Sequence, residues 1–181
     1  LYSDQSNITD ANIDDVWGEY TTGDGSQIVA ILDTGVDYTH PDLVDNIWEN
    51  IAERDGIAGF DDDGNGYVDD IYGWDFINAD NTPLDDNMHG THVAGIVGAV
   101  GGNGKGIAGA AWNVKLMSIK VFQSNGTGNS TTIAEGVTYS AINGATILNM
   151  SFGGYAESQT LKSALENAYA SSVLVGAAGN D

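Results

Sequence analysis

Asp33 and His89 are the residues of this chain whose types and settings best suit proton transfer. Asp33 follows the apolar run at residues 28–32 and precedes a small-residue turn, whereas His89 precedes small apolar residues typical of a closely packed helix. A carboxylate that holds one ring nitrogen of a histidine allows the other nitrogen to take a proton from a nucleophile. An isolated aspartate at the end of a strand is also typical of a turn or a helix cap. The proton-transfer interpretation of Asp33 and His89 therefore depends on the elements that would bring the two residues together.

Apolar runs alternate with helix-like segments along the chain. We expect strands at residues 27–32, 114–122, 146–151 and 172–177, and helices at residues 91–100, 131–143 and 158–170. This alternation predicts parallel βαβ units with right-handed crossovers, that is, an α/β fold with a doubly wound, mostly parallel sheet and helices on both faces. In such a sheet Asp33 lies beyond the carboxyl end of a strand, where ligands bind.

Two segments interrupt this alternation. One is a helix-like segment at residues 9–17, and the other is a Gly- and Asp-rich loop at about residues 55–88, in which we expect little regular structure. A loop of this length inside a domain is usually functional or held by an ion. The 181 residues, 41% of them hydrophobic, suffice for one core and therefore for one domain.

Composition limits the classes of partner. The net charge of -21 argues against nucleic acid, because such binding needs a basic surface. No apolar run is long enough to predict a membrane span, the chain does not begin like a signal peptide, and it has no cysteine for a disulfide. The acidic residues are concentrated between Asp55 and Asp86. Their mutual repulsion would disfavour a compact loop unless cations neutralise it, so we predict bound cations, with calcium as the candidate.

The segment that begins at Asp61 has the spacing of an EF-hand calcium loop. Positions 1, 3, 5, 6, 7 and 9 of such a loop are Asp61, Asp63, Asn65, Gly66, Tyr67 and Asp69. Position 12, which usually carries a bidentate glutamate, is Tyr72, so Asp70 or Asp62 would have to supply the missing oxygen. We expect a calcium loop without the EF-hand fold, and the alternative is an acidic, solvated turn.

Three motifs resemble those of the subtilisin-like serine peptidases, the subtilases: ILDTGV at residues 31–36, HGTHVAG at residues 89–95 and AAGN at residues 177–180. The resemblance runs from about residue 17 onward. It implies that Asp33 and His89 are two members of an Asp-His-Ser triad and that Asn180 donates a side-chain N–H to the oxyanion. The alternative for Asn180 is a turn residue. His92 is then expected to be a neutral, packed histidine, and the alternative is a metal ligand together with His89.

The same resemblance implies where a polypeptide substrate binds. The specificity pocket and the segment that pairs with residues upstream of the scissile bond correspond to Gly126, Thr127, Gly128, Ser151, Phe152, Gly153 and Gly154. An extended peptide would add between these segments as a strand. Ser151 lacks the Gly-Thr-Ser-Met-Ala context of the family's nucleophile, which we expect to follow Asp181 on a central helix.

The chain is therefore expected to be the N-terminal part of one catalytic domain, with the Asp/Gly-rich insertion at about 55–88, and to be inactive alone. The resemblance further implies secretion, a pro-segment in the precursor and a C-terminal remainder that completes the site. Without that remainder the strand at residues 172–177 would have an unpaired edge, which predicts self-association.

Two further calcium sites follow from the resemblance, which brings the expected number of ions to two or three. One site resembles a medium-affinity loop of thermitase-like subtilases and comprises Asp75, Asn78, Asp80 and the carbonyls of Thr82 and Leu84. Asn78 stands there in place of an aspartate, and the lost charge should weaken the site. The other resembles the strong subtilase site and comprises Asp42, the side chain of Asn103 and the carbonyls of Val100, Lys105 and Ile107.

Two other classes of function compete with the peptidase. A non-catalytic calcium-binding or interaction module could keep the frame of a subtilase without its nucleophile. Nucleotide binding would rest on the GxGxxG pattern at residues 104–109, but this pattern follows a helix-like segment and does not follow a strand. The presence of both Asp33 and His89 favours the peptidase.

Overall fold

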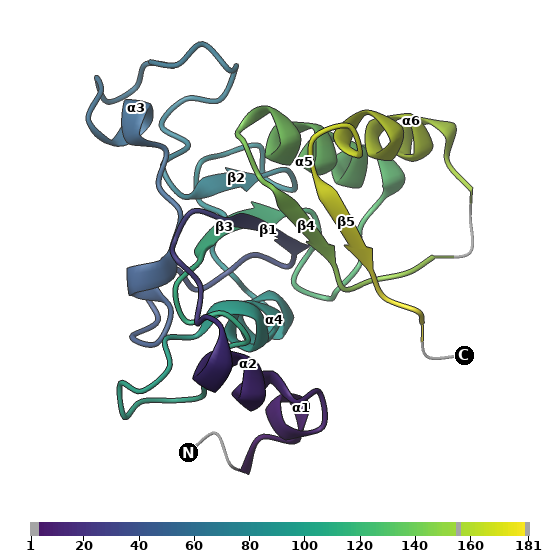
Figure 1. Cartoon of the computed structure of the whole chain (residues 1–181). Coiled ribbons are helices and arrows are strands. Elements are labelled where there is room, and N and C mark those ends of the chain that lie inside the picture. The colour runs from purple at the N-terminus through teal and green to yellow at the C-terminus, as the bar shows by residue number, and fades with distance from the viewer. Residues whose placement is uncertain (1–3, 155–156, 180–181) are drawn as a thin grey trace.

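The computed structural model describes residues 4–154 and 157–179, and its centre is a five-stranded sheet (Figure 1). The strands are β1 (Ile28–Asp33), β2 (Gly73–Asp75), β3 (Lys115–Lys120), β4 (Ile147–Met150) and β5 (Val173–Gly176). Their order across the sheet is β2-β3-β1-β4-β5, so the first strand in the chain is the central one. The pairings of neighbouring strands are parallel, as the predicted βαβ units require.

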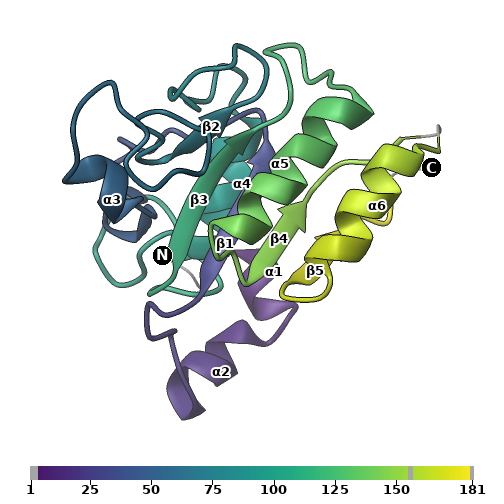
Figure 2. The same cartoon turned by 90° about the horizontal axis from the view of Figure 1, so that it is seen from above.

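Helices cover both faces of the sheet (Figures 1 and 2). On one face lies α4 (His89–Gly98), near α1 (Ser6–Thr9) and α2 (Ile13–Glu19), and on the other lie α5 (Ser130–Ile142) and α6 (Gln159–Ala168). Two short helical segments also lie in the described residues, the 3-10 helix η2 (Val44–Asn46) and α3 (Ile51–Arg54). Within the described residues no helix has the length and hydropathy of a membrane span. The α/β fold class expected from the sequence is confirmed.

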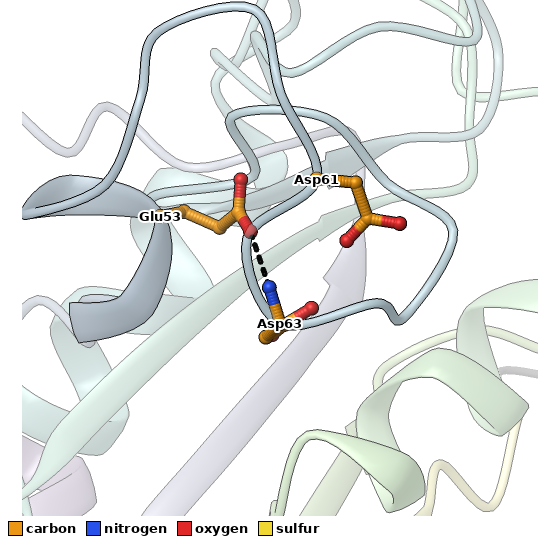
Figure 3. Close-up of side chains that lie close together, drawn as sticks. All are labelled: Glu53, Asp61 and Asp63. Carbon is orange, nitrogen blue, oxygen red and sulfur yellow. Dashed lines mark hydrogen bonds between the residues drawn. The ribbon is translucent and has the colours of Figure 1, made fainter.

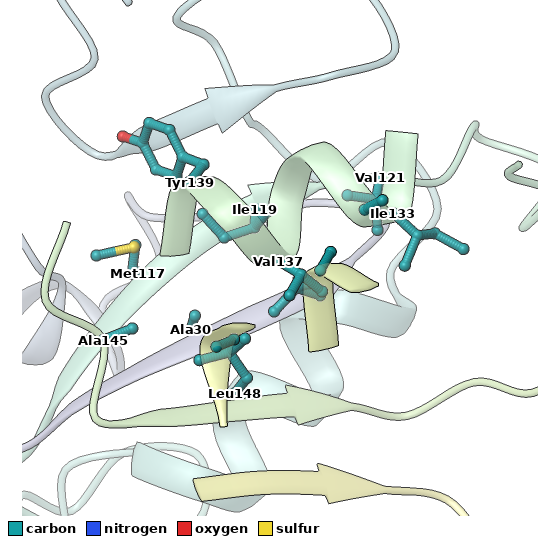
Figure 4. Packing of buried hydrophobic residues seen from close by; sticks show 13 residues of the cluster. Ala30, Met117, Ile119, Val121, Ile133, Val137, Tyr139, Ala145 and Leu148 are labelled. Atoms are coloured by element: carbon teal, nitrogen blue, oxygen red, sulfur yellow. The ribbon is translucent and has the colours of Figure 1, made fainter. Parts of the chain in front are cut away.

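The central strand β1 is buried on both faces, which explains why its sequence is an uninterrupted apolar run. Ala30 and Leu32 belong to the cluster that α5 covers (Figure 4). Val29 and Ile31 belong to a second cluster, on the side of α4. Because both clusters hold the strand, the position of Asp33 at its end is fixed as well.

The loop at residues 55–88 has little regular structure, as expected, whereas the expectation for the N-terminal helix is corrected. Residues 55–88 contain β2, which pairs with β3 at the edge of the sheet. Gly73 allows this pairing, because its φ is 123° and a Cβ there would overlap the carbonyl oxygen of Ser118. The single helix expected at residues 9–17 is instead the pair α1 and α2, and Asn12, between them, has a left-handed φ of 53°.

Candidate active site and metal-binding loops

His89 and Asp33 meet at the carboxyl end of the sheet. The Nδ1 atom of His89 lies 2.8 Å from Oδ1 and 2.9 Å from Oδ2 of Asp33. Asp33 is 1% exposed, and its Oδ1 also accepts a hydrogen bond from the Thr34 N–H at 2.7 Å, whereas 52% of the His89 side chain is exposed. The buried carboxylate thus holds the ring by Nδ1 and leaves Nε2 available, which is the arrangement that a general base requires.

Close backbone contact brings the start of α4 to this carboxylate. The Gly90 N–H donates to the Thr34 hydroxyl oxygen at 3.1 Å. A Cβ on Gly90 would overlap the carbonyl oxygen of Gly35 and press on Asp33. Glycine is therefore required at this position if the helix is to begin against the turn that follows β1.

Asp85 is a further member of this arrangement, which the sequence motifs did not reveal. Its Oδ1 accepts hydrogen bonds from the Thr34 hydroxyl at 2.8 Å and from the N–H groups of Asn87 and Met88. Its Oδ2 accepts from the N–H and the hydroxyl of Thr91 at 2.9 and 2.6 Å. Burial raises the pKa of Asp85, but these hydrogen bonds outweigh burial and leave the pKa lowered. Asp85 therefore ties the turn after β1 to the first turn of α4.

A cleft of about 210 Å³ lies beside Asp33 and His89. Its other lining residues are Thr34, Asn87, Phe122, Gly126, Ser151 and Phe152. The loops after β1, β3 and β4 contribute five of them and the loop between β2 and α4 contributes Asn87, so the cleft lies beyond the carboxyl ends of neighbouring strands, where ligands of open α/β sheets bind. Phe122 and Phe152 pack edge to face with ring centroids 4.9 Å apart, and this contact joins the loops after β3 and β4.

The predicted substrate residues divide between the cleft and its surroundings. Three of them line the cleft: Gly126, Ser151 and Phe152. Four others lie outside its lining: Thr127, Gly128, Gly153 and Gly154. The Thr127 carbonyl accepts a hydrogen bond from the Gln123 N–H at 2.8 Å, which closes the turn that carries Gly126.

The two remaining active-site expectations concern Ser151 and Asn180. The Ser151 hydroxyl accepts a hydrogen bond from the Asn149 side-chain amide at 2.9 Å, whereas the side-chain hydrogen bonds of His89 go to Asp33. The expectation that Ser151 is not the nucleophile stays a prediction. Asn180 lies outside the described residues.

Three carboxylates converge at the base of the acidic loop (Figure 3). Glu53 of α3, Asp61 and Asp63 each place one oxygen within 4.8 Å of the others. Glu53 is 3% exposed, and its oxygens accept the N–H groups of Asp62, Asp63 and Asp69 at 2.7–3.1 Å. Three like charges so close repel one another unless a cation lies among them, and carboxylate oxygens suit calcium. The EF-hand pattern did not predict Glu53. That pattern expects a glutamate at position 12, the end of the loop, whereas Glu53 precedes position 1, which is Asp61.

The other predicted ligands of this loop face donors of the protein itself. Asp70 is fully buried and accepts hydrogen bonds from the Tyr139 hydroxyl at 2.5 Å and the Asn65 amide at 3.0 Å. Burial raises the pKa of Asp70 in spite of these hydrogen bonds. The Asp69 carboxylate accepts a hydrogen bond from the Gly59 N–H of the same loop. The Tyr67 ring packs edge to face on the ring of Tyr139. Asp70 therefore anchors the loop to α5.

The second predicted calcium loop forms a tight turn around Asp75. Its Oδ1 accepts the Asn78 N–H at 3.0 Å and its Oδ2 accepts the Asn78 amide at 2.8 Å. Asp75 and Asp80 pair through their backbones, and the Asp80 carboxylate accepts the Thr82 N–H at 2.9 Å. The structure thus brings these three side chains into one turn, and Leu84 follows in the same loop.

The third predicted site is centred on Asp42, which is 2% exposed. Its two carboxylate oxygens accept the Asn103 amide at 2.7 Å and the Ile107 N–H at 2.9 Å. Its carbonyl accepts the Val100 N–H at 3.0 Å, and the Lys105 N–H donates to the Asn103 side chain at 2.9 Å. The five predicted residues of this site therefore lie together around one buried carboxylate.

A model of the subtilase family matches residues 24–181. The chain belongs to the subtilase family. This subtilase is 38% identical over 99% of its length to the "Thermophilic serine proteinase" of Bacillus sp. (strain AK1), and 38% identical over 87% of its length to the thermitase of Thermoactinomyces vulgaris. Subtilisin-like protease 1 of Plasmodium falciparum (isolate 3D7) is 44% identical over 68% of the chain. The chain spans 38%, 48% and 18% of the lengths of these three relatives.

Among solved structures, sphericase has the same arrangement of elements. The two structures agree with a TM-score of 0.70 at 33% sequence identity, and the match covers 93% of this subtilase and 52% of sphericase. The family predicted from the three sequence motifs and the fold predicted from the alternation of strands and helices are therefore confirmed. The roles of individual residues stay predictions, which the geometry above supports.

Proposed function

We propose that this subtilase chain forms the N-terminal part of the catalytic domain of a calcium-stabilised serine endopeptidase. The observation that carries the proposal is the contact of both Asp33 oxygens with Nδ1 of His89, at the wall of a cleft. The naming of relatives as proteinases supports the same class of reaction. In this proposal the nucleophile is a serine that follows Asp181 in the complete protein.

Asp33 and His89 divide the work of proton transfer between them. His89 takes the proton of the serine at Nε2 as the serine attacks the scissile carbonyl, and then gives it to the leaving amine. Asp33 keeps the other proton on Nδ1 and stabilises the imidazolium, and burial of Asp33 strengthens this interaction because little water screens it. Asn180 donates its side-chain N–H to the oxyanion.

An extended polypeptide is the proposed substrate, and it is bound between the loops after β3 and β4. Gly126 and Ser151 from these two loops line one cleft with His89, so a peptide strand between them would present its carbonyl to the catalytic pair. The edge-to-face pair of Phe122 and Phe152 supplies an apolar wall for a side chain of the substrate. Secretion and a pro-segment in the precursor belong to the same proposal.

Calcium is the proposed cofactor. Glu53, Asp61 and Asp63 fit a hard cation, because their oxygens converge and the carboxylate of Glu53 is buried. The groups around Asp42 and around Asp75 would hold further ions. The cation supplies positive charge that offsets the repulsion among the carboxylates of the loop, and a loop held in this way restrains the chain that leads to α4.

The proposed function is tested with an organophosphonate probe, which reacts with an activated serine. The complete protein should be labelled at a serine beyond Asp181, and the 181-residue chain alone should not be labelled. Labelling should be lost in His89→Ala and kept in His92→Gln, a matched change one helical turn away. Labelling of the isolated chain at Ser151 would overturn the assignment of the nucleophile. A complete protein that binds calcium and takes no label would instead be a non-catalytic calcium-binding module.

A further inference from the structure

Lys120 is a buried cation beneath the cleft. The chain has five Lys and Arg residues in all, yet Lys120 is only 1% exposed. It is the last residue of β3, and it lies in register with Asp33 of β1 on one side and Asp75 of β2 on the other. A lysine is rarely buried in this way unless its charge is paired and its donors are used.

The ammonium group of Lys120 uses all three of its N–H donors. It donates to the carbonyl of Thr34 at 2.7 Å, to the carbonyl of Phe122 at 3.1 Å and to Oδ1 of Asp86 at 2.6 Å. The ion pair with Asp86 joins a buried group to a half-exposed one, because the two side chains are 2% and 49% exposed. An ammonium has three donors, so none is left for another partner.

These three acceptors belong to the three segments that make the proposed active site. Thr34 directly follows Asp33. Phe122 begins the segment that leads to Gly126, and it packs on Phe152 across the cleft. Asp86 belongs to the loop just before His89. One side chain therefore joins the catalytic turn, the substrate segment and the loop that leads to the general base.

We propose that Lys120 is a positioning residue that sets the distance between the substrate segment and the Asp33–His89 pair, with Asp86 as its counter-ion. The proposal rests on the proposed peptidase function. Upstream residues of a substrate raise the rate only if the segment that binds them is held in a fixed relation to the reacting groups. Lys120 supplies this relation from beneath the site, without touching the substrate.

The proposal predicts that the effect of Lys120 depends on the length of the substrate. A peptide with four residues upstream of the scissile bond uses the substrate segment, whereas a substrate with a single upstream residue does not. A purely structural lysine would lower the fraction of folded enzyme, and this loss would reduce kcat equally for both substrates. A positioning lysine would reduce kcat for the long substrate more strongly than for the short one.

The experiment uses the complete protein and four variants. Lys120→Met removes all three hydrogen bonds, Asp86→Ala removes only the half-exposed counter-ion, and Asp86→Asn keeps an oxygen acceptor. Lys162→Met is the matched control, because Lys162 is exposed on α6 and loses the same charge. We expect the ratio of kcat for the long to the short substrate to fall about tenfold in Lys120→Met and about threefold in Asp86→Ala. Asp86→Asn should restore part of the loss, and Lys162→Met should leave the ratio unchanged.

Hydrogen exchange provides a readout that does not need activity. In the wild type the N–H groups of Val121 and Phe122 donate to the Asp33 carbonyl at 2.9 and 3.2 Å. Loss of Lys120 or Asp86 should speed exchange at residues 33–37 and 121–128 and leave α6 unchanged. If Lys120→Met does not fold, Asp86→Ala decides the question. An active wild type whose Asp86→Ala variant has an unchanged ratio and unchanged exchange overturns the inference. An inactive wild type contradicts the proposed function, and the exchange measurement then decides the inference.

Discussion

The Asp33–His89 pair and the acidic loop each contain a buried carboxylate, and the groups that surround it differ between the two. The oxygens of Asp33 meet a ring nitrogen and a backbone N–H of the chain. Glu53 also accepts backbone N–H groups, but two more carboxylates face it, those of Asp61 and Asp63. The first site is thus organised by the strands and the helix that carry it, whereas in the second three carboxylates converge in an arrangement that could hold a metal ion.

The strongest test of the first site is Asp33→Asn in the complete protein. An amide cannot hold His89 in the required tautomer, so we expect kcat to fall about 10⁴-fold, the size of the effect in another serine-peptidase triad. Asp45→Asn is the matched control, since Asp45 is exposed and is not among the residues that line the cleft. Steady-state kinetics with a chromogenic peptide measures both variants. A loss smaller than tenfold would contradict the proposed role of Asp33.

Removing calcium tests the second site. Each ion present at about 100 times its Kd stabilises the folded state by about 2.7 kcal/mol, which corresponds to a shift in Tm of roughly 5–10 °C for a protein of this size. Chelation should therefore lower the Tm measured by calorimetry. The shift should be smaller in Glu53→Gln and unchanged in Glu166→Gln, which alters an exposed carboxylate on α6. Equal midpoints with calcium and with chelator would show that the loop needs no ion.

Gly90→Ala tests how closely the first site is packed. The new methyl group would overlap the Gly35 carbonyl, so we expect the free energy of unfolding to fall by about 1–3 kcal/mol and kcat to fall with it. Gly18→Ala in α2 is the control, because no atom lies within 4 Å of its Cβ position and alanine favours the helix by roughly 0.5–1 kcal/mol. Urea denaturation compares the two. If both variants are equally stable, the start of α4 is not packed against the turn as described.

The sequence revealed those parts of the molecule that depend on local patterns. β1 was predicted from its apolar run because both of its faces are buried, and the same run placed Asp33 at a strand end. β2 gave no such signal, since it is three residues long and begins with a glycine whose role is to approach β3. A short edge strand depends on its partner, and only the folded sheet shows that partner.

The missed side chains of the two sites share one cause, which is contact between distant segments. Asp70 itself was predicted from its place in the loop, but the hydrogen bond that it accepts from Tyr139 on α5 was not. Glu53 lies before the loop that it completes, and Asp85 meets Thr34 across a separation of 51 residues. Spacing within a motif cannot report such contacts, because the crossovers of the sheet create them.

The order of the strands also has a consequence for the way the chain is made. Among the described strands β1 comes first in the sequence and lies at the centre of the sheet, but its neighbours begin only at Lys115 and Ile147. A polypeptide that grows from its N-terminus therefore carries an uncovered apolar segment until both neighbours have left the ribosome, and such segments favour aggregation. Asp33, at the end of that segment, lies in register with Lys120 and contacts His89, so its final surroundings form only after both of these residues have been synthesised.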